Sequence, residues 1–116
     1  GDGGLIGHEE QDIISRVIEE MNSIGFNLRG PFASDGYFAN QSYKKFDITV
    51  AMYHDQGLIP FKMISFDKGV NFTAGLNIIR TSPDHGTAFD IAGMGIANTE
   101  STKQAILLAE QFVINS

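Results

Sequence analysis

The residues with the most chemical potential lie in one short block, Tyr53-His54-Asp55-Gln56-Gly57. Residues 46–53 before it are mostly apolar or β-branched, which predicts a buried strand ending at the block. Open α/β sheets bind ligands at the C-terminal ends of their strands. The imidazole of His54 could bind a divalent metal or transfer a proton, and the carboxylate of Asp55 could orient it. The pair also fits a hydrogen-bonded loop closure, and spacing alone does not separate the two interpretations.

Three further polar side chains, Lys62, Asn71 and Arg80, follow within 26 positions of His54. Each lies in or beside an apolar stretch. Residues of this kind, and cations above all, either sit on the surface at the ends of elements or point into an anion site. Both interpretations stay open from spacing, and the second predicts an anion pocket on which the three side chains converge.

A second polar stretch, Asp84-His85-Gly86-Thr87-Ala88, precedes a predicted short helix over 87–92. Backbone amides at such a position could face an anion or a nucleotide, although a capped loop fits equally well. The glycines do not form the dinucleotide fingerprint G-x-G-x-x-G. Ile6 stands where the opening block would need its third glycine, and Gly93-Met94-Gly95 also lacks one. A Rossmann site is therefore not expected.

Elements that could position these residues are indicated by periodicity and by turn residues. Helices and strands alternate, which favours an α/β layered fold in a single unit over 1–116. Ser101 and Gln104 have the spacing of a capping box at the start of the last helix. The remaining expectations are a helix over 8–24 capped by Gly25, strands over 26–32, 70–73 and 77–81, a turn at 34–36, and the last helix over 101–113.

Composition excludes several classes of function. The 116 residues carry a formal net charge of −6 and a pI near 4.8, which argues against binding to nucleic acid. The absence of cysteine fits a reducing cytoplasm. No apolar run approaches the roughly 18 residues of a membrane span. The opening Gly1-Asp2-Gly3-Gly4 has no initiator Met, which predicts a cut made inside a longer protein.

The motifs together resemble a known enzyme family. Residues 51–58 (Ala-Met-Tyr-His-Asp-Gln-Gly-Leu), followed by Lys62, Gly69-Val70-Asn71, Arg80-Thr81-Ser82 and residues 84–88, are similar to the 4-hydroxythreonine-4-phosphate dehydrogenase family. The resemblance covers essentially the whole chain and implies that the chain is the C-terminal portion of a longer dehydrogenase. Residues 85–98 are also similar to the cofactor loop of isocitrate and isopropylmalate dehydrogenases. The resemblance therefore implies part of an isocitrate/isopropylmalate dehydrogenase-like layered fold.

This resemblance also implies a role for each matched position. His54 matches one of three histidines that hold a divalent cation (Zn, Mg, Co or Mn). In the family the other two histidines lie N-terminal to the position of Gly1. Asp35 and Asp55 match acidic residues near the reacting centre. Lys62, Asn71 and Arg80 match substrate-binding positions. The positions along the cofactor, NAD or NADP, are His85, Gly86, Thr87, Ala88, Asp90 and Asn98.

The implied reaction is the oxidation of a secondary alcohol in a small phosphorylated amino acid, with hydride passing to NAD and carbon dioxide lost from the resulting β-keto acid. That places the enzyme in pyridoxal 5′-phosphate biosynthesis, as a cytoplasmic homodimer, and predicts that this piece is inactive alone. Two alternatives stay open: a related dehydrogenase of an erythronate or threonate phosphate, and a non-catalytic dimerisation or binding module.

Overall fold

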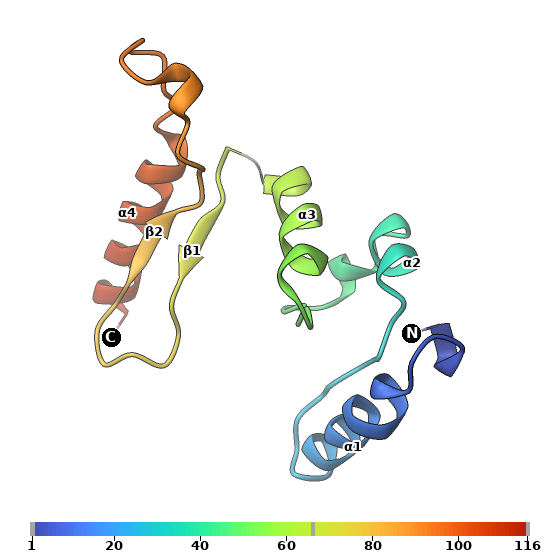
Figure 1. Cartoon of the computed structure of the whole chain (residues 1–116). Helices are drawn as coiled ribbons and strands as arrows, with labels where there is room; N and C mark the ends of the chain where they lie inside the picture. Colours follow the sequence, from blue (N-terminus) through green and yellow to red (C-terminus); the bar gives the residue numbers. More distant parts are fainter. Residues whose placement is uncertain (1, 66, 116) are drawn as a thin grey trace. The chain divides into compact units, whose positions relative to one another are not determined.

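Helices dominate the part of the chain that the computed structural model describes, residues 2–65 and 67–115 (Figure 1). The chain divides into two units, Gly1–Ala51 and Met52–Ser116. The single unit predicted from the sequence stays a prediction. Gly1, the first residue of the glycine-rich opening, lies outside the described residues, and a short 3-10 helix, η1 (Asp2–Gly4), follows it.

The first long helix of the sequence prediction is confirmed. A π-helical turn, η2 (Glu10–Ile14), runs into α1 (Ser15–Ser23). Gly25 follows with a φ of 103°, a left-handed conformation that favours glycine after a helix C-terminus.

The strand predicted over 26–32 is wrong: this segment follows α1 as an irregular extended chain. Its backbone polar groups are used by a side chain of α1. The amide of Asn22 donates to the Leu28 carbonyl at 3.1 Å and accepts from the Leu28 N–H at 2.7 Å. A single asparagine therefore replaces the neighbouring strand that a sheet would need.

The turn predicted at 34–36 is also wrong, because these residues begin the helix α2 (Ser34–Ala39), which η3 (Ser42–Lys45) follows. Tyr37 of α2 is 7% exposed and stacks with Phe32 and Phe46 at centroid distances of 5.3 and 6.1 Å. Its hydroxyl is hydrogen-bonded to Thr49 at 2.6 Å. This aromatic cluster stabilises a short helix where local sequence favours a turn.

The buried strand predicted over 46–53 is not formed. No segment among the described residues pairs with it, and Ile48 and Val50 are 81% and 74% exposed. A strand with apolar residues on both faces is stable only inside a sheet that supplies its hydrogen bonds and covers both faces.

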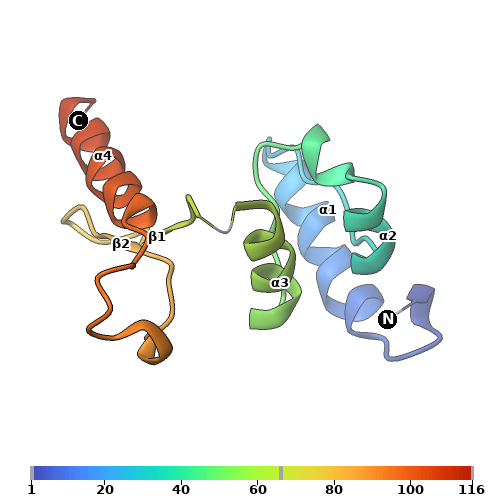
Figure 2. The ribbon, with the colours of Figure 1, turned by 90° about the horizontal axis from the view of Figure 1, so that it is seen from above.

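The second unit packs a hairpin against a helix. It begins with α3 (His54–Ser65) and continues with the strands β1 (Val70–Phe72) and β2 (Thr81–Pro83). The strands are antiparallel, with Val70 opposite Pro83. The helix α4 (Glu100–Ile114) lies along the hairpin (Figures 1 and 2). Among the contacts that hold it, Phe72 and Phe112 stack at 4.8 Å, and Thr81 Oγ1 donates to the Ala105 carbonyl at 2.9 Å.

The predicted elements of this unit are confirmed in part. The strand over 70–73 and the last helix are present, whereas the strand over 77–81 is displaced to 81–83. The predicted helix over 87–92 is reduced to the 3-10 turn η4 (Phe89–Ile91). The capping box is wrong, since the Asn98 side chain accepts from the Glu100 N–H at 2.9 Å and Ser101 bonds elsewhere.

The described residues thus form a mixed structure of helices and a sheet, consistent with the α/β class predicted from the sequence. The isocitrate dehydrogenase-like layering stays a prediction. No helix in the described ranges is both long enough and apolar enough to cross a membrane.

Candidate functional site

His54 and Asp55 open a helix instead of closing a strand, because α3 begins at His54. Their side chains form a pair, with His54 Nδ1 2.8 Å from Asp55 Oδ1. When Asp55 is ionised it accepts the Nδ1–H hydrogen bond, which leaves the lone pair of the neutral ring on Nε2. The side chains are 78% and 72% exposed, so Nε2 is open to a ligand.

This arrangement fits one position of a metal site. Histidine ligands usually donate their second ring N–H to a carboxylate or a carbonyl, as His54 does to Asp55. No group of three or more His, Cys, Asp or Glu side chains is gathered in the described part of the chain. His54 would contribute one ligand to such a site.

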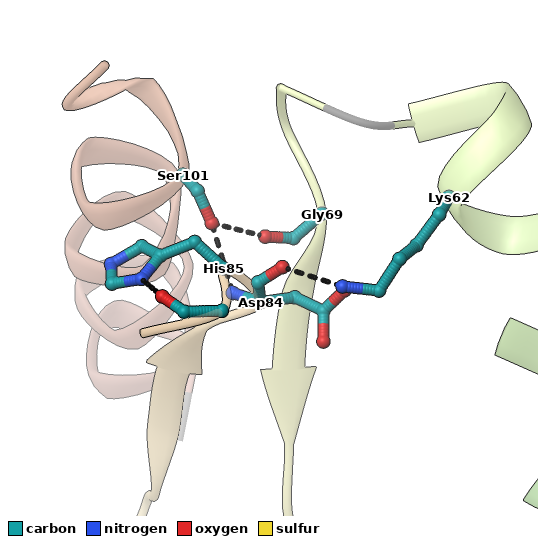
Figure 3. A network of polar contacts seen from close by, with 6 residues as sticks. Lys62, Gly69, Asp84, His85 and Ser101 are labelled. Atoms are coloured by element: carbon teal, nitrogen blue, oxygen red, sulfur yellow. Dashed lines mark hydrogen bonds and ion pairs between the residues drawn. The ribbon is translucent and has the colours of Figure 1, made fainter. Parts of the chain in front are cut away.

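Lys62 lies two turns further along α3, roughly 12 Å from His54 along the helix axis for eight residues of rise. Its ammonium reaches the residue that follows β2 (Figure 3). Lys62 Nζ is 3.2 Å from Asp84 Oδ2 and 3.2 Å from the Asp84 carbonyl oxygen. The Lys62 side chain remains 41% exposed, so the cation is held in place without being covered.

Asn71 and Arg80 lie on the face of the hairpin that points away from α4. Side chains alternate between the two faces of a strand, and Phe72 and Thr81 contact α4. Asn71, opposite Ser82, and Arg80 therefore share the other face. The Arg80 guanidinium donates to Thr73 Oγ1 at 2.8 Å.

The predicted convergence of Lys62, Asn71 and Arg80 is not seen as direct contact. Among the described residues, no hydrogen bond or ion pair joins them to one another or to His54. Asp35 lies in the other unit, in α2, where its Oδ1 accepts from the Gly36 N–H at 2.7 Å. The shared site of these residues stays a prediction.

The predicted cofactor positions form an exposed loop after β2. Residues 85–90 are all exposed, and His85 Nδ1 is hydrogen-bonded to the Gly86 carbonyl at 3.1 Å. Thr87 precedes Ala88, which has a left-handed φ of 49° and leads into η4 with Asp90. The exposed backbone and polar groups of this loop are open to contact by a dinucleotide.

Asn98, the last predicted cofactor residue, fixes the end of this loop. Its amide donates to Asp67 Oδ1 at 3.3 Å and accepts from the Glu100 N–H. Each end of the amide is thus already used once within the chain. Asn98 retains one N–H and one lone pair for a cofactor.

Asp84 and Ser101 were not predicted as site residues. Asp84 is the first residue of the polar stretch over 84–88, so its position in the sequence was a usable signal. Ser101 is 6% exposed and bonds across more than 30 positions to the Gly69 carbonyl at 2.6 Å. Local spacing suggested only a helix cap for it, because long-range partners leave no trace in spacing.

The model of one protein family, Pyridoxal phosphate biosynthetic protein PdxA, matches residues 1–109. The chain belongs to this family. Relatives include enzymes named 4-hydroxythreonine-4-phosphate dehydrogenase. The one from Roseobacter denitrificans is 57% identical over 94% of the chain, and the one from Prosthecochloris aestuarii is 52% identical over 98%.

A solved structure supports the same assignment. The crystal structure of a 4-hydroxythreonine-4-phosphate dehydrogenase from Burkholderia phymatum matches with a TM-score of 0.69 and 43% identity, over 94% of this chain and 33% of that one. The chain likewise spans about a third of the Roseobacter and Prosthecochloris relatives. The match to the PdxA family therefore covers nearly all of this chain, and the chain covers about a third of these family members.

Proposed function

We propose that this chain is part of an NAD-dependent 4-hydroxythreonine-4-phosphate dehydrogenase. The enzyme oxidises and decarboxylates 4-phosphohydroxy-L-threonine to 3-amino-2-oxopropyl phosphate in pyridoxal 5′-phosphate biosynthesis. One observation carries the proposal: relatives bearing that enzyme name are 50–57% identical across at least 94% of the chain. The cytoplasmic location and the homodimer belong to the same proposal.

His54 supplies one ligand to a divalent cation, through the Nε2 that its bond to Asp55 leaves available. A bound cation of this kind stabilises negative charge that develops on a substrate oxygen. Asp55 holds the imidazole ring in one orientation and in one tautomer. Asp35 takes part in proton transfer near the reacting centre.

Lys62, Asn71 and Arg80 hold the anionic substrate. Lysine and arginine are suited to this because they stay charged at neutral pH and donate several hydrogen bonds. Asn71 and Arg80 already share one face of the hairpin, and Lys62 is tied to the end of β2. The hairpin is thus the platform on which the substrate is oriented.

The loop over His85–Asn98 binds the cofactor through His85, Gly86, Thr87, Ala88, Asp90 and Asn98. Bound NAD accepts the hydride, and the protein contributes placement. Since residues 85–90 are exposed in this chain, cofactor binding should cover them.

A substrate panel tests the proposal. A full-length enzyme carrying this segment is assayed for NADH formation with 4-phosphohydroxy-L-threonine, 4-phosphoerythronate and threonate 4-phosphate, each with added divalent metal. We expect the highest kcat/KM with the first. Higher kcat/KM with another substrate would favour a related dehydrogenase, and no turnover with any of them would favour the non-catalytic module.

A further inference from the structure

We propose that Asp84 is a positioning residue for Lys62, and that Ser101 fixes the backbone from which Asp84 does this. The inference rests on the proposed function, in which Lys62 binds the substrate. It adds two residues to the site, one after β2 and one in α4, neither of which was among the predicted site residues.

Asp84 makes two contacts with one ammonium group: its main-chain carbonyl accepts a hydrogen bond, and its carboxylate forms an ion pair. Its carboxylate and its main-chain carbonyl each lie 3.2 Å from Lys62 Nζ (Figure 3). An ammonium group has three N–H donors and the carbonyl takes one of them, so Lys62 can still donate to a substrate anion. A hydrogen bond and an ion pair to the same residue restrict the long Lys62 side chain more than the ion pair alone would.

This pair differs from an ordinary surface ion pair. Exposed pairs contribute little, because both side chains are mobile and solvated. The Asp84 side chain is only 18% exposed, and its backbone N–H donates to Ser101 Oγ at 3.0 Å. The position of the carboxylate is therefore set by a part of the chain that Lys62 does not contact.

Ser101 connects three elements through one hydroxyl. It accepts from Asp84 after β2 and donates to the Gly69 carbonyl before β1 at 2.6 Å, while its own backbone belongs to α4. The side chain is buried, so water competes poorly for these hydrogen bonds. The position of the Lys62 ammonium is thus set by the hairpin and α4, and not by α3 alone.

Asp84 is also the residue directly before the predicted cofactor loop. The same residue that holds Lys62 thus precedes His85 and Gly86 in the chain. The backbone of Asp84 therefore positions both the Lys62 ammonium and the start of the cofactor loop. Removing the carboxylate should disturb the position of Lys62 and leave the loop in place, because the bond to Ser101 is made by the Asp84 backbone.

The test is a double-mutant cycle in a full-length enzyme carrying this segment. Calorimetry measures the Kd of 4-phosphohydroxy-L-threonine in the absence of NAD, and separately the Kd of NAD. Asp84→Asn should raise the substrate Kd about tenfold, as expected for the coupling between two residues of one ion pair, and leave the NAD Kd unchanged. In a Lys62→Met background the same change should have no further effect. Glu110→Gln, an exposed glutamate of α4, is the matched charge control.

Equal rises in both backgrounds, or no rise in either, would overturn the inference, since Asp84 would then act independently of Lys62. If Asp84→Asn does not fold, Asp84→Glu is used, and its rise in substrate Kd should again vanish without Lys62. A wild-type enzyme that neither binds nor oxidises the substrate would overturn the proposed function and this inference with it. An active wild type with additive changes would overturn the inference alone.

Discussion

The main-chain oxygen of Gly69 accepts a 2.6 Å hydrogen bond from the buried hydroxyl of Ser101. This contact joins the start of β1 to the first turn of α4. Gly69 itself is buried and also closes α3, because its N–H donates to the Ser65 carbonyl at 2.8 Å. The helix α3, the hairpin and the helix α4 therefore meet at Gly69, which has no side chain.

Gly69→Ala should destabilise the second unit. A Cβ at position 69 would lie 2.8 Å from the ring of Phe61 and 3.3 Å from the Ser65 carbonyl oxygen. Both distances require a shift of neighbouring atoms, and overpacking of this kind costs about 1–3 kcal/mol in the free energy of unfolding. Urea denaturation of the chain, followed by circular dichroism, measures this loss.

Gly86→Ala is the matched control for that measurement. Position 86 lies in the same unit, no atom approaches its Cβ position within 4 Å, and its φ is not left-handed. It should be neutral or stabilising by about 0.4–1 kcal/mol, because alanine restricts the unfolded chain. If Gly69→Ala is as stable as Gly86→Ala, the close approach at Gly69 is not a constraint.

Acid should weaken the N-terminal turn of α4. The Gln104 side chain, hydrogen-bonded to Glu100 at 2.7 Å, and the nearby Lys103 charge hold the pKa of Glu100 below its ordinary value of 4.5. A lowered pKa means that the carboxylate adds stability above pH 4.5 and loses it as pH falls through the lowered value. Glu100→Gln should therefore reduce the loss of helical signal on acidification below pH 4.5.

Circular dichroism of the wild type, Glu100→Gln and Glu110→Gln across pH 6 to 3 makes the comparison. Glu110 is an exposed glutamate of the same helix and controls for the change in net charge. Identical acid profiles for the wild type and Glu100→Gln would contradict this account of the helix start.

The helices that could be predicted are those whose apolar residues recur at helical spacing along the whole helix. The last helix was predicted over 101–113 and found as Glu100–Ile114, because its apolar side chains recur at helical spacing and meet a partner in the hairpin. The helix before Gly25 was predicted from the same spacing of apolar residues. Tyr37 shows the limit, because its short helix depends on ring contacts with Phe32 and Phe46.

Composition alone could not decide whether the strand predicted over 46–53 forms. Its apolar residues describe what the segment would do inside a sheet, whereas strand formation depends on neighbours that the described residues do not supply. The candidate site residues could be named from the sequence because they are consecutive or follow at a recognisable spacing, and their roles stay predictions. Asp84 and Ser101 were missed because their roles come from contacts across 22 and 32 positions.

The 116-residue chain alone should show no dehydrogenase activity. Catalytic metal sites typically have three protein ligands, and no such group is gathered in the described part of this chain. The assay follows NADH formation by the purified chain with 4-phosphohydroxy-L-threonine, NAD and Zn, Mg, Co or Mn. A full-length enzyme carrying the segment is the positive control. Metal-dependent NADH formation by the chain itself would refute this expectation.

The central claim is that His54 is a metal ligand of a dehydrogenase, and one substitution tests it most directly. In the full-length enzyme, His54→Ala should lower kcat at least 10²–10³-fold, roughly 2.7–4 kcal/mol, because stabilisation of charge on the reacting oxygen is lost. The loss should be largest at limiting metal and only partly reversed by excess metal. His8→Ala, at an exposed histidine outside the motifs, is the matched control and should behave as wild type.

The measurement is a steady-state assay of wild type, His54→Ala and His8→Ala across a metal titration, with circular dichroism to confirm that each variant is folded. The account predicts a folded His54→Ala enzyme that stays far below wild type at every metal concentration. Near wild-type turnover by folded His54→Ala, at a metal concentration that just saturates the wild type, would contradict it.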